Sequence, residues 1–153
     1  MKIHRSVPPP TVMPVLVYPD VRAAVDFLTA TFGFVQRIRI GEDHRAQAAV
    51  GTDGAAIIAD VGGDRSPPRQ GGMTHLVRVR VPDVDAAFAR ACDHGTVVLE
   101  GPVDREYGER DCTIEDLASR RWQLAQAVAD VAPEEFGCET VSPWPAYQPG
   151  DRV

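Results

Sequence analysis

Apolar and polar residues in the first part of the chain follow a pattern that predicts one strand, one helix and three more strands. Residues 11–18 are mostly apolar and partly β-branched, which favours a buried strand, although Pro14 suits a sheet edge or a bulge. Asp20 can cap a helix whose apolar side chains recur at helical spacing until Gly33 ends it. Three further segments have strand character, in the order 34–40, 45–51 and 54–60.

The same order of elements returns after an interruption. Residues 61–72 contain glycine, proline and charge without apolar periodicity, which is typical of a linker. Residues 73–81 then alternate as a strand, and Asp83 can cap a helix that ends at Gly95. Further strands are expected at 96–100, 109–115 and 119–127. Residues 128–153 are rich in proline, glycine and acidic side chains, and we expect an extended arm.

A short repeat supports the idea of a duplicated unit. The sequence Pro-Asp-Val-x-Ala-Ala begins at Pro19 and again at Pro82, at the start of each expected helix. Alanine-rich helices produce such echoes by chance, but the shared order of elements around both copies favours duplication. We therefore predict the α+β fold class, with two tandem βαβββ modules forming an open, cupped mixed sheet. The expected boundaries within a single domain 1–153 are a first module 11–60, a linker 61–72, a second module 73–127 and a C-terminal arm 128–153.

Length and composition limit the function classes that fit the chain. Its 153 residues suffice for one domain with a core, and no apolar run is long enough to span a membrane. The net charge of −6 argues against binding to nucleic acid or to an anionic membrane. The three cysteines are far apart and form no CxxC pair, so we expect neither a disulfide framework nor a zinc cluster, and we expect a reducing cytoplasm.

A longer segment near the end resembles a known family. Residues 107–126 read YGERDCTIEDLASRRWQLAQ. This is similar to a recurring segment of the vicinal oxygen chelate superfamily, the glyoxalase, bleomycin-resistance and extradiol-dioxygenase group. The resemblance covers residues 11–127. It implies that each module forms half of a cup that holds a ligand, and that the protein is a homodimer. Members of this group include metal-dependent enzymes and also metal-free proteins that only bind drugs, so the site residues must decide between them.

The residues at the metal positions that the resemblance implies are poor ligands. In the metal enzymes of the group, one ligand lies seven residues before the aspartate that opens each helix, and here these positions hold Met13 and Leu76. Gln123 stands at the position on the last strand, and a divalent cation prefers imidazole or carboxylate to any of these three. Weak candidates are His75, which strand alternation turns away from the cup unless a bulge intervenes, and Asp60. We expect no metal cofactor, with a divalent metal in an atypical site as the alternative.

Strand alternation also sorts the residues that could line the cup. If Leu76 faces the cup, then Thr74, Arg78 and Arg80 share its face. On the last strand, Arg121 and Gln123 share one face, and the first strand supplies an apolar wall. The candidate ligand-binding residues are Met13, Val15, Thr74, Leu76, Arg78, Arg80, Arg110, Arg121 and Gln123.

These candidates suit a small organic ligand that carries a carboxylate, phosphate or phenolate, because arginine can hold planar oxyanions with two parallel hydrogen bonds. The alternative is that Arg78 and Arg80 are solvated or paired with acids such as Glu109 and Glu115, and that Arg110 joins strands through an ion pair. The acidic net charge is compatible with a cationic ligand instead.

These observations predict a metal-independent protein that binds a small organic molecule and sequesters an antibiotic or another toxic compound. The alternative is a metal-dependent lyase, isomerase or dioxygenase with an atypical ligand set. A third alternative is a dimer without catalytic activity that has a structural or regulatory role.

Overall fold

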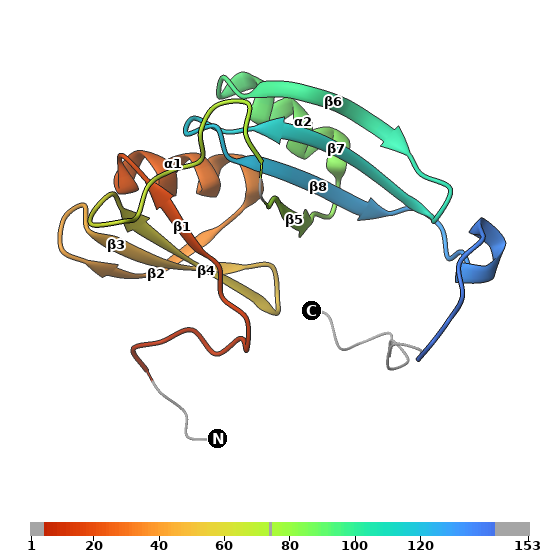
Figure 1. The fold of residues 1–153 in the computed structure, drawn as a ribbon, viewed down its shortest axis with the longest axis horizontal. Helices are drawn as coiled ribbons and strands as arrows, with labels where there is room; N and C mark the ends of the chain where they lie inside the picture. The colour runs from red at the N-terminus through yellow and green to blue at the C-terminus, as the bar shows by residue number, and fades with distance from the viewer. Residues whose placement is uncertain (1–4, 74, 143–153) are drawn as a thin grey trace.

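The chain forms two βαβββ modules, as the repeat predicts (Figure 1). The structure is a computed structural model, and it describes residues 5–73 and 75–142. The first module contains β1 (Val15–Tyr18), α1 (Val21–Phe32), β2 (Val35–Ile40), β3 (Arg45–Val50) and β4 (Gly54–Asp60). The second contains β5 (Val77–Arg80), α2 (Val84–Asp93), β6 (Val97–Asp104), β7 (Glu109–Glu115) and β8 (Arg121–Ala127). A short 3-10 helix, Pro133–Phe136, follows β8.

The two modules share one sheet topology, which confirms the expected α+β architecture. Strand order is β1-β4-β3-β2 in the first sheet and β5-β8-β7-β6 in the second. In each module the first strand pairs in parallel with the last, and the other neighbours pair antiparallel, so both sheets are mixed. Helices α1 and α2 lie together on one side of the two sheets, which leaves the opposite face of each sheet open (Figure 1).

Both helices begin where the capping pattern predicts. The Asp20 carboxylate accepts a hydrogen bond from the Ala23 N–H at 2.8 Å, and Asp83 accepts one from Ala86 at 2.9 Å. Gly33 closes α1 with a φ of 73°, a conformation that favours glycine because it has no Cβ. Within the described ranges, neither helix is long and apolar enough to cross a membrane.

Three strands differ from the sequence prediction by four residues at one end, each for a local reason. β1 begins only after Pro14, which has no N–H to donate and joins the sheet through its carbonyl, which accepts from Ile57 N at 2.9 Å. β5 is shorter than 73–81 because Val77 pairs with Trp122, close to the start of its partner strand β8. β6 continues past the expected end at residue 100, since a shift in register absorbs the Gly-Pro pair that follows.

Aromatic side chains join the two modules in one core. Trp122 of β8 is fully buried and lies with its ring centroid 5.2 Å from that of Phe32 and 5.8 Å from that of Phe34. These two phenylalanines belong to the end of α1 and the segment that follows it. The second module therefore fills its apolar centre with side chains of the first, and the two modules share one hydrophobic core.

A buried carboxylate links the modules beside these rings. Asp116, in the turn before β8, accepts hydrogen bonds from the Tyr18 hydroxyl at 2.5 Å and from the Trp122 indole N–H at 2.8 Å. The same turn places Arg120, whose guanidinium donates to the Val17 carbonyl at 3.1 Å and lies 5.3 Å from the centre of the Tyr18 ring. Burial, and then the adjacent Asp116 charge, raise the pKa of Tyr18 far above its ordinary value, so this hydroxyl remains a donor.

We expect Asp116→Ala to lower the free energy of unfolding by about 3–5 kcal/mol, because it leaves buried donors from both modules without an acceptor. Tyr18→Phe, which removes one of these donors, should cost about 1–2 kcal/mol. Urea denaturation measures both. Asp130→Ala, at an exposed position, is the matched control and should stay within about 0.5 kcal/mol of the parent. An Asp116→Ala protein as stable as this control would contradict the role of the carboxylate.

Candidate ligand-binding site

The strand phase expected from the sequence places three predicted residues together on the open face of the second sheet. Arg78 of β5 is the register partner of Gln123 of β8, and its guanidinium donates to the Gln123 side chain. Arg80 lies two residues further along the same strand. The intervening Val79 is buried in the hydrophobic core, as alternation requires.

The arginines of this face are paired with carboxylates. Arg78 and Arg80 both donate to Glu109 on β7, the second at 3.2 Å, and Arg121 donates to Glu115 at 3.2 Å. This is the pairing that the sequence left open as an alternative. An anionic ligand at this face would have to displace carboxylates that the strands hold in place.

Asp111 is the centre of this charged network. Its side chain is fully buried and accepts hydrogen bonds from Arg78 at 3.2 Å, from Arg105 at 2.8 Å and from the Tyr107 hydroxyl at 3.0 Å. Burial is the largest influence on Asp111 and raises its pKa, but the hydrogen bonds from Arg105, Tyr107 and Arg78 together outweigh it. The pKa of Asp111 therefore lies below its ordinary value, and that of Glu109 is lowered in the same way against the effect of burial.

The remaining predicted residues lie elsewhere. Arg110 is on the opposite face of β7 from Arg78, where it pairs with Asp85 of α2 at 2.9 Å and with Asp104 of β6 at 3.0 Å, so it does join strands. Val15 and Arg121 line a second pocket near the linker. Met13 and Leu76 are half-buried and precede β1 and β5, and Thr74 lies outside the described residues.

The residues at the expected metal positions do not fit a divalent cation. Gln123 is engaged by Arg78, and the Asp60 carboxylate contacts His44 Nδ1 at 2.9 Å and Arg65 at 3.2 Å. The Nε2 of His75 lies 3.3 Å from the Arg120 guanidinium, which can only donate, so the nitrogen lone pair faces a cation. Among the residues that the structure describes, no three His, Cys, Asp or Glu side chains are grouped to hold a metal ion.

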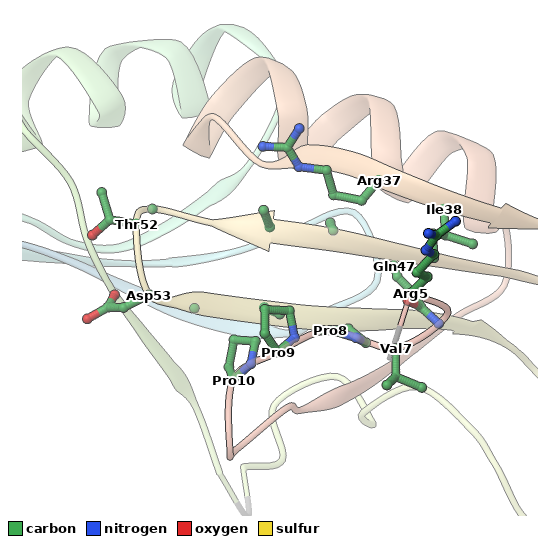
Figure 2. Close-up of a pocket in the computed structure, with 15 residues that line it drawn as sticks. Arg5, Val7, Pro8, Pro9, Pro10, Arg37, Ile38, Gln47, Thr52 and Asp53 are labelled. Carbon is green, nitrogen blue, oxygen red and sulfur yellow. The ribbon is translucent and has the colours of Figure 1, made fainter. Parts of the chain in front are cut away.

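A cavity of about 640 Å³ lies on the open face of the first sheet, beneath the segment that precedes β1. Pro8, Pro9 and Pro10 run alongside the strands and form its cover (Figure 2). Its floor is made of small residues of β3 and β4, among them Ala49 and Ala55, which are register partners. Alanine at these positions leaves space that β-branched side chains would fill.

Polar groups stand at the two ends of this cavity (Figure 2). Thr52 and Asp53 are at the β3–β4 turn, and Arg5 and Gln47 are at the other end, beside the apolar Ile38. The Gln47 amide donates to the Ser6 carbonyl at 3.1 Å and so anchors the segment. The prolines have no N–H to pair with the sheet, which keeps the segment from closing onto it as a further strand.

Sequence reasoning missed this cavity. The alanines of β3 and β4 were a signal, since a strand lined with alanine on its open face cannot fill the space above it. The proline segment gives no such signal, because periodicity does not say where a segment without secondary structure lies.

Acid should weaken the charged network of the second sheet. The pKa values of Asp111 and Glu109 are lowered by folding, so their contribution to stability is complete above their ordinary values and is lost as the pH falls below them. We expect the urea midpoint to fall between about pH 5 and pH 3. Asp111→Asn should lower the midpoint at neutral pH and flatten this dependence, whereas Asp130→Asn should keep it. An equal pH dependence in all three proteins would exclude the network as its source.

Comparison with known proteins shows the family. The model of the Glyoxalase/Bleomycin resistance protein/Dioxygenase superfamily matches residues 11–124. The uncharacterized protein Mb0911c of Mycobacterium bovis is 31% identical in an alignment of 136 residues, and the match covers 83% of this chain and 90% of that protein.

Two solved structures have the same fold with moderate sequence similarity. TioX from Micromonospora sp. ML1 is 27% identical with a TM-score of 0.61, and the match covers 79% of this chain and 98% of TioX. A glyoxalase/bleomycin resistance protein from Streptomyces sp. CB03234 is 27% identical with a TM-score of 0.59, over 74% of this chain and 97% of that one. The family-model match, together with this shared fold, shows that the chain belongs to the Glyoxalase/Bleomycin resistance protein/Dioxygenase superfamily.

Proposed function

We propose that this protein is a metal-independent binder of a small organic molecule, which it sequesters as an antibiotic or another toxic compound. The observation that carries this proposal is the 640 Å³ cavity between the proline segment and the first sheet. Pockets for small organic ligands have volumes of about 300–1,000 Å³, apolar walls and a few polar groups that fix orientation. The cavity has all three properties.

The lining favours a flat ligand with an apolar body and an acidic group. Alanines on one side and proline rings on the other are small and rigid, so they suit a planar skeleton. Arg5 and Arg37 are exposed at this cavity, and neither takes part in an ion pair within residues 5–73 and 75–142. They differ in this from Arg78, whose charge is already matched, and they can hold an oxyanion without displacing a carboxylate.

The cellular compartment and the oligomeric state are proposed from the cysteines and from the family resemblance. The widely spaced cysteines Cys92, Cys112 and Cys138 are all free thiols, which suits a reducing cytoplasm. Burial raises the pKa of Cys112 to about 11, so this thiol is inert rather than a nucleophile. The family resemblance supports a homodimer, and no feature of the chain favours nucleic acid or a membrane as a partner.

Ala49→Trp should abolish binding in the cavity, because the indole fills the space between β3 and the proline segment. We expect a thermal-shift screen of hydrophobic antibiotics, aromatic acids and coenzyme A esters to find a ligand for the parent protein. At one hundred times its Kd, a ligand adds about 2.7 kcal/mol of stability, which raises Tm by about 5–10 °C in a domain of this size. The shift should disappear in Ala49→Trp.

Ala89→Trp, on the exposed face of α2, is the matched control and should keep the full shift. A ligand that shifts Ala49→Trp as strongly as the parent would place binding outside this cavity. A screen in which no compound raises the midpoint would favour a structural or regulatory role instead.

Protein purified without chelators should contain only substoichiometric metal by elemental analysis, since the donors near the expected positions are occupied by arginines. His75→Ala should leave the metal content unchanged. One equivalent of iron, manganese, nickel or zinc that is lost on His75→Ala would contradict the proposal and favour a metal-dependent lyase, isomerase or dioxygenase.

A further inference from the structure

A second cavity, of about 360 Å³, lies where the linker meets the two modules. Val15 and Val17 of β1 form an apolar wall, and Arg120 and Arg121 come from the start of β8. The linker and the segment after it add Ser66, Pro68, Arg69, Gly72, Met73 and His75. No residue of this lining belongs to the cavity beneath the proline segment, so the two sites can be tested separately.

The lining is cationic although the chain as a whole is acidic. Among the residues that the structure describes, it contains three arginines and one histidine but no aspartate or glutamate. The net charge of the full chain is −6. Of the three arginines, only Arg121 is in an ion pair within the described ranges, with Glu115.

Arg120 is the residue that points to a ligand. Only 3% of its surface is exposed, and its guanidinium donates to the Val17 carbonyl and lies 3.3 Å from His75 Nε2. Its Nε is buried without a hydrogen-bond partner. Asp116, the carboxylate of the same turn, accepts from the Arg120 backbone N–H and directs its other oxygen to Tyr18. The guanidinium lies 5.3 Å from the Tyr18 ring, whose hydroxyl donates to Asp116, but no carboxylate among the described residues forms a direct ion pair with it. An anion in the cavity would supply that pair for a buried charge.

We propose that this cavity binds a small organic acid, with its carboxylate on Arg120 and its apolar body against Val15 and Val17. Arginine donors form a fork that matches the two oxygens of a planar carboxylate. Arg120 already belongs to the lining of the cavity, so an anion bound there can accept from its guanidinium. Arg69, exposed on the linker, supplies a second charge at the rim. The apolar wall distinguishes a carboxylate on a hydrocarbon body from a simple inorganic oxyanion, whose remaining oxygens would face valine and methionine.

The probe for this site is benzoate, added to the full-length protein while backbone amide signals are followed by NMR. We expect saturable shifts at Val15, at Val17 and at Ser119, which lines the cavity beside Arg120. Benzamide has the same shape without the charge, and inorganic phosphate has the charge without the apolar body. Both should bind at least ten times more weakly than benzoate.

Variants assign the binding to the residues named. Arg69→Ser should weaken benzoate about three- to tenfold, and Met73→Glu, which introduces a carboxylate into the lining, should weaken it more than tenfold. Arg39→Ser removes an equal charge from an exposed position outside both cavities and should leave the affinity unchanged. Arg120→Lys keeps the charge without the fork and should lose more than tenfold. If Arg120→Lys does not fold, Arg69→Ser and Met73→Glu still test whether benzoate binds in this cavity.

The same titration separates this site from the proposed main cavity. Ala49→Trp should bind benzoate as the parent does, so failure of one site leaves the other testable. Benzoate shifts that are centred on the proline segment and vanish in Ala49→Trp would overturn the second site. Equal affinity for benzamide would exclude recognition of the charge. Equal affinity for phosphate would exclude an organic acid as the favoured ligand.

Discussion

The position of the two modules relative to each other depends on one buried carboxylate, that of Asp116. It accepts from Tyr18 of the first module and from Trp122 of the second, and both donors are fully buried. Because an unpaired donor in the core is costly, the carboxylate fixes the edge strand β1 against the start of β8. The turn that carries it also places Arg120 against β1, so the geometry of the linker cavity follows from the same contact.

Charged side chains are paired on the second sheet and are not paired in the same way at the two candidate sites. On the second sheet, Arg78 and Arg105 converge on Asp111, and the strands carry acids and arginines in facing positions. Such a network holds the sheet together but presents little free charge to a ligand. Within the described part of the chain, arginines without an ion-pair partner occur at the proline segment and at the linker, where Arg37 and Arg120 line the two cavities. The two proposed sites for an acidic ligand therefore lie at the covered ends of the fold and not at the centre of the charged face.

Both cavities are bounded on one side by a strand and on the other by a segment without regular structure. The proline segment covers small side chains of β3 and β4, and the linker covers the valines of β1. In each case the sheet forms a rigid floor of the cavity. The irregular segment adds a charged side chain to the lining and covers the side from which a ligand would enter. A fold with open sheet faces can in this way hold different ligands without changing its core, because covering segments vary more readily than packed strands.

The sequence by itself determined the elements, their order and the face on which each strand residue lies. Asp20 and Asp83 predicted both helix starts, and alternation placed Arg78 with Gln123, because capping and strand phase are local properties. Only the tertiary structure decided which charged and polar side chains become partners. Glu109 of β7 reaches Arg78 of β5 across the intervening strand β8, and Asp116 reaches Tyr18 across ninety-eight positions of sequence. It also decided that the proline segment returns over Ala49, since the path of a segment without periodicity depends on the surface on which it lies.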